Sequence, residues 1–255
     1  MLVIALFAVA PAPRAALLGR RSTLAAAAGA FASPTLLRPT FADEVEGGAQ
    51  WELTLPDRFA IARRLASIVR IRVETMLSAD DGRGTTAKLL LLPLGQQTAG
   101  SLTADEQLLL ARYFIGGGDG AAPSSADVAN ALAASARRSP TVLSLALKGA
   151  ASESSRRGRR YVAYEYAAAK CAGEIDGGQC LGTTSARRNL AVATIAPISQ
   201  YRTNTERARM AELGQERNVD VLWLLTLSAD EAAWSPELRR ELDGVAGSFV
   251  SSAGQ

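Results

Sequence analysis

Six arginines in two short segments have the clearest capacity for binding chemistry in this sequence, because a guanidinium group holds a carboxylate through two parallel hydrogen bonds. The segments read SSRRGRRYVAYEY and SARRNLAVATIAPI. They supply Arg156, Arg157, Arg159, Arg160, Arg187 and Arg188. If the segments form adjacent strands, all six side chains can line one end of a sheet and form a salt-sensitive docking surface for an acidic partner. The alternative is a solvated loop with Glu153 as partner, because charge runs usually face water.

Groups suited to catalysis are sparse. The chain has no histidine and no Gly-x-Ser-x-Gly segment, so the usual pairs of base and nucleophile are missing. Two pairs of neighbouring acids, Asp80 with Asp81 and Asp230 with Glu231, fall in predicted turns. Carboxylates there are more typical of solvated turn formers than of an acid–base pair. The sequence therefore predicts no catalytic residue and no enzymatic activity.

Two cysteines, Cys171 and Cys180, flank a glycine-rich turn in the segment KCAGEIDGGQCLG. In an oxidising compartment a disulfide can close this hairpin loop, with a gain of about 2 to 3 kcal/mol. Two free thiols are the alternative. In a chain without histidine, two cysteines do not complete the four-ligand shell of a structural zinc ion, so no metal site is predicted.

Residues 1–42 have the composition of a targeting leader, because they are rich in alanine and contain four arginines but no acid. Arg20 and Arg21 precede a short apolar run in a twin-arginine pattern, and small residues ending at Ala32 or Ala42 suit cleavage. A second apolar block opens the chain, so we expect two successive sorting signals, as in a plastid protein routed to an inner compartment. The alternative is a low-complexity alanine tract. Neither run reaches the roughly 20 residues of a membrane span, so we expect a soluble mature protein.

The excess positive charge lies in this leader. The whole chain has 28 basic and 25 acidic residues, and without the four leader arginines 24 basic residues face 25 acidic ones. Binding to nucleic acid or to a membrane surface through overall charge thereby loses its main support. Residues 43–255 are expected to form a single domain.

Apolar periodicity predicts the elements that position these groups. Strands are expected within 51–55, 68–77, 85–95, 139–149, 159–170, 185–198 and 219–234. Helices are expected within 101–115, 126–138 and 236–249. Thr103 and Glu106 form a candidate capping box at the first helix. The segment 199–218 is long, charged and compatible with a helix, which makes it a candidate contact region.

The C-terminal part predicts how the sheet is covered. The segment 219–234 is apolar on both faces, as a central strand would be, and Trp234 is expected to fill the corner after it. Ser235 and Pro236 suit the start of a helix. One stripe of this helix should dock on the sheet while Arg239, Arg240 and Asp243 face outward. The docking residues are Leu238, Leu242, Val245 and Phe249. Together these elements predict an α+β domain on an antiparallel sheet.

Three segments in this order, RRYVAYEYAAA, RRNLAVATIAP and VLWLLTLSADEAAWSPELRRELDGVAGSF, resemble the closing half of the PsbP family of thylakoid-lumen proteins. The opening WELTLPDRF is similar to the start of the family as well. The resemblance implies an αβα sandwich on a central antiparallel sheet. It implies an extrinsic lumenal subunit or accessory factor of photosystem II, peripheral to the thylakoid membrane. An assembly chaperone of the lumen and an extrinsic subunit of photosystem I are the alternatives.

The resemblance also bears on ligands and partners. Well-known family members help to retain calcium and chloride, so calcium is a cofactor by resemblance alone. The implied partners are a photosystem core or other extrinsic subunits. Members often carry a histidine where this chain has Arg187, Arg188 and Asn189, which leaves metal-binding proposals for the family without a clear residue here. A related sandwich binds a small GTPase in the nucleus, but the leader argues against that location.

Overall fold

The computed structural model describes residues 50–65, 73–95, 102–117, 121–177, 179–199, 204–214 and 218–252. Its strands are β1 (Trp51–Glu52), β2 (Ala60–Arg64), β3 (Glu74–Asp80), β4 (Thr86–Pro93), β5 (Val142–Leu147), β6 (Ser152–Arg156), β7 (Arg159–Ala172), β8 (Ile175–Asp176), β9 (Gln179–Cys180), β10 (Thr183–Ser199), β11 (Asn218–Asp230) and β12 (Val250–Ser251). Its helices are α1 (Ala104–Phe114), α2 (Ser125–Arg137), α3 (Asn204–Glu212) and α4 (Pro236–Ser248), with a 3-10 turn, η1 (Glu231–Ala233). The leader, its twin arginines and the proposed cleavage sites lie outside the described residues.

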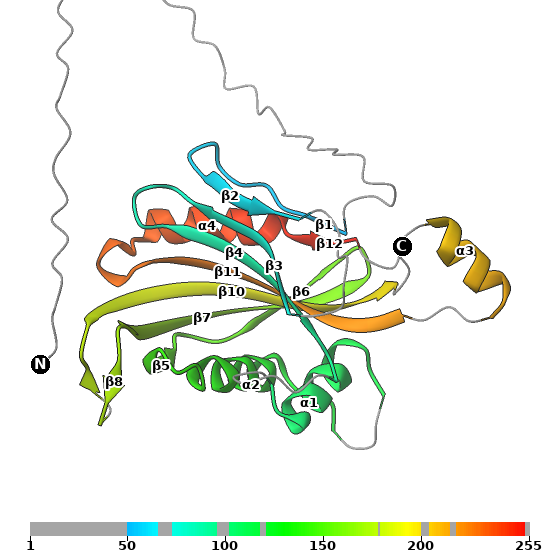
Figure 1. The fold of residues 1–255 in the computed structure, drawn as a ribbon, viewed down its shortest axis with the longest axis horizontal. Coiled ribbons are helices and arrows are strands. Elements are labelled where there is room, and N and C mark those ends of the chain that lie inside the picture. The colour runs from blue at the N-terminus through cyan, green and yellow to red at the C-terminus, as the bar shows by residue number, and fades with distance from the viewer. Residues whose placement is uncertain are drawn as a thin grey trace, which may run out of the picture. The chain divides into compact units, whose positions relative to one another are not determined.

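An antiparallel sheet organises the described chain. Its strands follow the order β2-β3-β4-β11-β10-β7-β5, and β6 also pairs with β7. Helix α4 covers one face, and α1 with α2 covers the other (Figure 1). The predicted α+β class and the αβα sandwich are thus confirmed.

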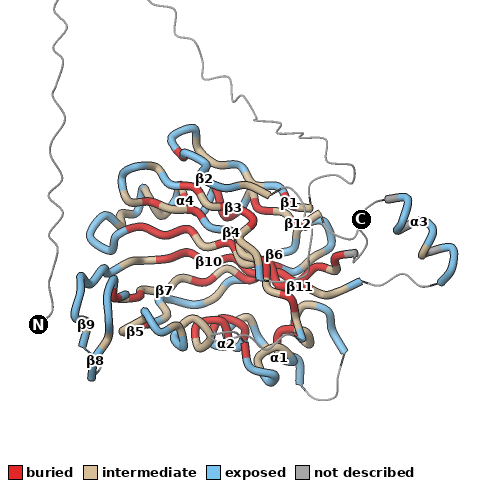
Figure 2. The backbone as a smooth tube through the Cα atoms, viewed as in Figure 1, coloured by how far each residue is buried: buried red, intermediate tan, exposed pale blue. Residues whose placement is uncertain are grey.

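Strand β11 occupies the middle of the sheet, as its apolar character on both faces predicts. It pairs with β10 on one side and β4 on the other. Trp223 and Leu225 point into the core beneath α4, whereas Leu222 belongs to the core beneath α1 and α2. Figure 2 shows the buried residues concentrated along the central strands.

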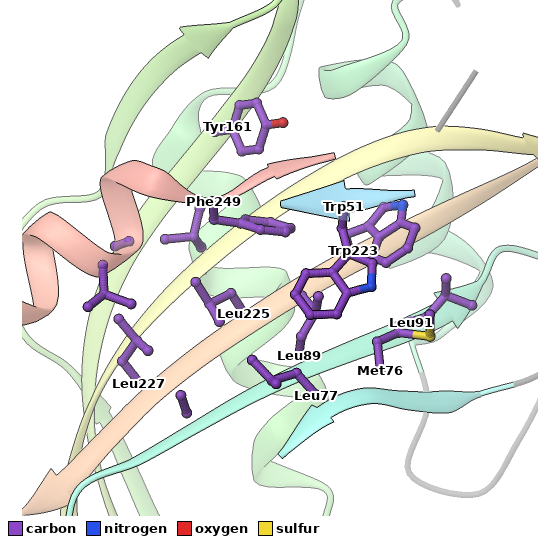
Figure 3. Close-up of a cluster of buried hydrophobic side chains, with 14 of the residues drawn as sticks. Trp51, Met76, Leu77, Leu89, Leu91, Tyr161, Trp223, Leu225, Leu227 and Phe249 are labelled. Atoms are coloured by element: carbon purple, nitrogen blue, oxygen red, sulfur yellow. The ribbon is translucent and has the colours of Figure 1, made fainter. Parts of the chain in front are cut away.

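The core beneath α4 joins the first and last described segments of the chain. Figure 3 shows Trp51 from β1, Phe249 after α4 and Tyr161 from β7 around Trp223. The Tyr161 and Phe249 rings meet edge to face at 5.9 Å between centroids, a favourable aromatic arrangement. The Tyr161 hydroxyl accepts a 2.9 Å hydrogen bond from the backbone N–H of Ser251. Phe249 is fully buried, so the expected docking of the last helix is confirmed.

The helix N-termini follow their capping signals. Thr103 and Glu106 form the predicted capping box of α1, and Ser235 accepts a hydrogen bond from the N–H of Leu238 at α4. Sequence reasoning missed the equivalent box of Ser124 and Asp127 at α2.

Strands β2, β6, β8, β9 and β12 were not predicted, and one prediction about a helix was wrong. Strand β2 is largely exposed at the sheet edge, and β6 is polar, so neither has an apolar period to detect. On α4, Arg239 does not simply face outward, because its Nε donates to Glu165 on β7 at 2.9 Å. Residues 68–72 of the strand expected within 68–77 lie outside the described residues.

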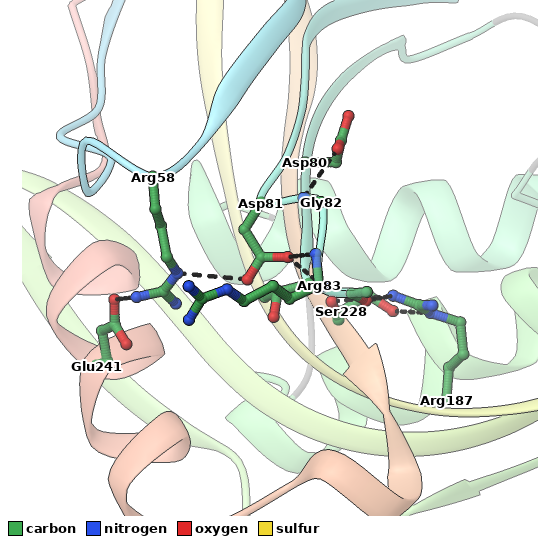
Figure 4. Close-up of polar contacts among 10 residues, drawn as sticks. Arg58, Asp80, Asp81, Gly82, Arg83, Arg187, Ser228 and Glu241 are labelled. Carbon is green, nitrogen blue, oxygen red and sulfur yellow. Dashed lines mark hydrogen bonds and ion pairs between the residues drawn. The ribbon is translucent and has the colours of Figure 1, made fainter. Parts of the chain in front are cut away.

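The β3–β4 hairpin forms at the predicted turn, but one of its acids is not solvated. The side chain of Asp81 is only 3% exposed. Its carboxylate accepts hydrogen bonds from the backbone N–H groups of Arg83 and Thr85 and from Arg58 (Figure 4). Burial alone would raise the pKa of Asp81, but these donors outweigh it and hold the pKa below its ordinary value. Asp81 is therefore a structural turn residue.

Cys171 and Cys180 form a disulfide with their Cα atoms 5.5 Å apart. The bridge lies at the tip of the β7–β10 hairpin, where β8 and β9 form a small separate ladder. The structure thus selects the disulfide over two free thiols.

We predict that replacing Cys171 and Cys180 together with serine lowers the free energy of unfolding by about 2 kcal/mol, because the loop that the bridge closes is short. Urea denaturation of the two proteins measures the difference. Adding a thiol reductant should bring the wild-type chain to the stability of the double variant and leave the variant unchanged. Equal stabilities of oxidised and reduced wild type would contradict the prediction.

Candidate functional site

The six arginines do not gather at one end of the sheet. Strands β7 and β10 are adjacent and antiparallel as predicted, but Arg187 lies opposite Ala168. Ala168 is eight residues beyond Arg160 along β7, or about 26 Å at the rise of an extended strand. The expectation of one six-arginine surface is therefore wrong, because the long hairpin places the two groups at opposite ends.

Arg156 ends β6 and Arg157 lies in the tight turn between β6 and β7, and both bind other parts of the chain. The Nη1 atom of Arg156 donates to the carbonyls of Ala246 and Phe249, at 2.7 and 2.8 Å, at the C-terminal end of α4. Its guanidinium also lies 4.8 Å from the centroid of the Tyr161 ring. Arg157 has a φ of 47° and forms two hydrogen bonds with Glu52 in β1. These two arginines clamp the hairpin onto the terminal segments.

The other arginines are engaged as well. Arg160 donates to the Tyr113 carbonyl at 3.1 Å and lies 3.8 Å from Glu153. Glu153 is the partner expected under the solvated-loop alternative. Arg188 bonds to Glu165 and lies over the Trp234 ring, 5.5 Å from its centroid. Arg159 also has an interaction partner. Binding of a partner by these six arginines stays a prediction. Such a partner would compete with the contacts that the arginines make inside the fold.

We predict that Arg156→Ala lowers the free energy of unfolding by about 2 to 3 kcal/mol, because two charge-assisted hydrogen bonds at a helix C-terminus are lost. Arg156→Lys should recover only part of this loss, since an ammonium group lacks the planar stacking surface of guanidinium. Chemical denaturation checks both variants. Arg240→Ala, on the exposed side of α4, is the control and should change stability by less than about 0.5 kcal/mol. An equal effect of Arg156→Ala and Arg240→Ala would refute the clamp.

The structure contains a hollow that sequence reasoning missed, on the sheet face beneath α1 and α2. It encloses about 350 Å³. We call it the basic groove. Its lining residues are Thr86, Lys88, Leu90, Leu92, Leu102, Leu132, Ser135, Ala136, Ser139, Tyr164, Tyr166, Lys170, Arg187, Asn189, Leu222, Leu224, Thr226 and Ser228.

The basic groove changes from apolar to polar along the strands. Residues opposite each other on β4 and β11 change character at the same level of the sheet. The pairs are Leu92 with Leu222, Leu90 with Leu224, Lys88 with Thr226, and Thr86 with Ser228. Asn189 of β10 lies opposite Ser228 and extends the polar end toward β7. It is buried, and its amide donates to the carbonyls of Tyr166 and Arg187.

Three cations mark the polar end: Lys88, Lys170 and Arg187. Arg187 is held by Asp230 at 2.9 Å, by the Ser228 hydroxyl at 2.8 Å and by the Gly84 carbonyl at 2.7 Å. Among the described residues, neither lysine has an ion-pair partner. Partial desolvation, followed by repulsion from Lys88 and Arg187, lowers the pKa of Lys170. An anion bound at this polar end would relieve this repulsion.

The tyrosines of β7 form one wall of the basic groove. Tyr164 and Tyr166 stack with their ring centroids 5.9 Å apart. Burial raises the pKa of both hydroxyls, that of Tyr166 to about 12. Both phenols are therefore neutral at physiological pH and add no negative charge beside the lysines.

The acidic pairs that the sequence analysis considered do not line the basic groove. The pair Asp80 and Asp81 belongs to the β3–β4 turn, and exposed Glu231 lies in η1. The described residues hold no cluster of three or more cysteine, aspartate or glutamate side chains that could bind a metal ion. The calcium implied by the family resemblance thus has no evident donor set among them.

Among the described residues, no helix is both long and apolar enough to cross a bilayer.

A signal for the basic groove was present in the sequence. Lys88 interrupts an apolar strand at a position that shares a face with Leu90 and Leu92, and Lys170 continues the face of Tyr164 and Tyr166. Neither signal shows that the two lysines line the same groove, because β4 and β7 are separated by two other strands.

We predict that Lys170→Met raises the free energy of unfolding at neutral pH by about 0.5 kcal/mol, a small gain because solvent screens the exposed side chain. The sign follows from the lowered pKa, since the protonated lysine is less favourable in the folded state than in the unfolded state. The electrostatic part of the gain should disappear above the ordinary lysine pKa of 10.5. Denaturation at several pH values measures it, with Lys148→Met as the control at an exposed lysine outside the basic groove. A loss of stability specific to Lys170→Met would count against charge repulsion.

Comparisons with known proteins leave the family open. No protein-family model matches the chain, and no curated protein matches it. Among solved structures, it is similar to cyanobacterial PsbP (CyanoP) from Synechocystis, with 14% identity and a TM-score of 0.36 over 80% of this chain and 87% of that one. It is also similar to LpqN, involved in cell envelope biogenesis of Mycobacterium tuberculosis, with 12% identity and a TM-score of 0.36 over 81% of this chain and 86% of that one. Scores below 0.5 assign no function to this chain.

Proposed function

We propose that this chain is a non-enzymatic binding protein that recognises an acidic group of its ligand or partner at the polar end of the basic groove. The observation that carries the proposal is the presence of Lys88, Lys170 and Arg187 in the lining of one groove whose other end is apolar. Two of these cations lack an ion-pair partner in the described part of the chain. Clustered like charges repel one another, and a bound acidic group would relieve that repulsion.

The biological setting we propose is the lumenal face of a photosynthetic membrane, where the chain would act as a peripheral extrinsic protein of photosystem II. Two sequence observations support this setting. The segments that resemble the PsbP family coincide with β7, β10 and the β11 to α4 unit, and the leader has the composition of a twin-arginine signal. An assembly chaperone of the lumen and an extrinsic subunit of photosystem I are the alternative roles. Nothing in this proposal requires nucleic acid.

We predict that the double variant Lys88→Glu with Lys170→Glu reduces association with the membrane complex at least tenfold, because charge reversal repels an acidic partner. The full chain is imported into isolated chloroplasts, and the fraction bound to washed thylakoids is measured over a salt series. The control is Lys148→Glu with Arg240→Glu, which changes the net charge equally at exposed positions outside the basic groove. If both double variants bind alike, the basic groove is not the docking site.

The same experiment tests the setting. N-terminal sequencing of the imported protein should find Ser33 or Asp43 at the mature end, and protease protection should place the protein inside thylakoids. An uncleaved chain outside thylakoids would overturn the lumenal role. Co-purification with mature photosystem II favours a subunit, co-purification with photosystem I favours the second complex, and recovery only with immature complexes favours a chaperone.

A further inference from the structure

The apolar half of the basic groove offers a surface for a hydrocarbon chain. Leu90, Leu92 and Leu224 are only partly buried although they lie on the covered face of the sheet. Three further leucines line the same hollow: Leu222 from the sheet floor, Leu102 from the segment before α1 and Leu132 from α2. Apolar side chains beneath two helices that still expose surface gain free energy when an apolar ligand covers them.

The size of the basic groove fits one chain. Its volume of about 350 Å³ is near the lower limit of ligand pockets, which is about 300 Å³. From the level of Leu92 to that of Thr86 the floor runs six residues along β4, or about 20 Å. A narrow hollow of this length suits a single extended tail better than a lipid with two tails.

The polar half offers a site for an anionic head group. Arg187 is already oriented by Asp230 and Ser228, so Lys88 and Lys170 supply the charges that are free to move. The hydroxyl of Thr226 lies at the level of Lys88. The head group would thus meet mobile ammonium groups at the mouth, while the tail enters the apolar half.

A peptide fits the same surface less well. The basic groove lies over the face of the sheet, where strand N–H and C=O groups are occupied by the ladders between β4, β11, β10 and β7. A peptide lying on the leucine floor would bury its own backbone polar groups against apolar side chains, which costs several kcal/mol. A hydrocarbon tail has no such groups.

We propose that the basic groove binds a single-chain amphiphile with an anionic head group, its tail on the leucine floor and its head at the polar end that Lys88, Lys170 and Arg187 line. This inference rests on the proposed function in one respect, which is that the cations bind an acidic group. It adds the class of ligand. No bond is made or broken in this binding.

The test is calorimetric titration of the full chain with dodecanoate below its micelle concentration. Dodecanoate should bind at least tenfold more tightly than dodecanol, dodecyltrimethylammonium or acetate, because each of these lacks the charge, its sign or the tail. Across decanoate, dodecanoate and tetradecanoate, each added pair of methylenes should strengthen binding about tenfold until the tail fills the cavity. Binding of dodecanoate no tighter than that of dodecanol or acetate would overturn the inference.

Variants locate the site. Lys88→Glu with Lys170→Glu should weaken dodecanoate binding at least tenfold, whereas Lys148→Glu with Arg240→Glu should leave it within twofold of wild type. Thermal unfolding of each variant, with and without dodecanoate, separates lost binding from lost folding, because only a folded variant without a site shows a normal melting temperature and no ligand-induced rise. Equal binding by the two double variants would place the amphiphile elsewhere and refute the inference.

A further arm distinguishes this inference from the proposed function. If the chain binds phosphatidylglycerol vesicles but not dodecanoate, its ligand is a membrane surface. That result would overturn the proposal of a single-chain ligand. Loss of thylakoid association in the groove variant, without any dodecanoate binding, would retain the proposed function and remove only the amphiphile.

Discussion

The pairing register of β11 is the constraint on which both the core and the basic groove depend. This strand lies between β4 and β10, and its successive side chains point to opposite faces. In the observed register Trp223 and Leu225 fill the core beneath α4, while Thr226 and Ser228 line the basic groove. A slip of one residue would turn the hydroxyls toward the core beneath α4 and the tryptophan toward the basic groove. The apolar core therefore fixes where the polar residues of the site lie.

Arginine and lysine have different roles in this fold. Arg156 holds the end of α4, Arg188 and Arg239 share Glu165, and Arg187 ties β10 to the β3–β4 turn. The planar, multiply donating guanidinium suits such fixed contacts between elements. Lys88 and Lys170 lack ion-pair partners within the described residues, so the charges available to a ligand belong to the less conspicuous side chains. Basic clusters that are dense in sequence are here mainly structural.

The two faces of the sheet have different roles. The face beneath α4 stabilises the fold, and the face beneath α1 and α2 carries the basic groove. Beneath α4 the sheet is closed by large buried side chains, including Trp223, Tyr161 and Phe249. The indole N–H of Trp223 is buried without a hydrogen-bond partner in the described part of the chain, which indicates that packing dominates there. Beneath α1 and α2 the cover is partial, and repulsion at Lys170 is retained. The second face gives up some stability and keeps an accessible surface.

Much of the fold was predictable because it depends on local patterns. The alternation in 159–170, the apolar run of β11 and the caps at Thr103 and Ser235 each act over a few residues, so the sequence by itself determined the α+β class, most strands and the helix starts. The tertiary structure alone decided which charges meet. Arg160 and Arg187 belong to neighbouring strands yet lie far apart, whereas Lys88 and Lys170 line one groove although two other strands separate β4 from β7. The physical reason is that register and strand order arise from packing of the whole sheet, which no local period records.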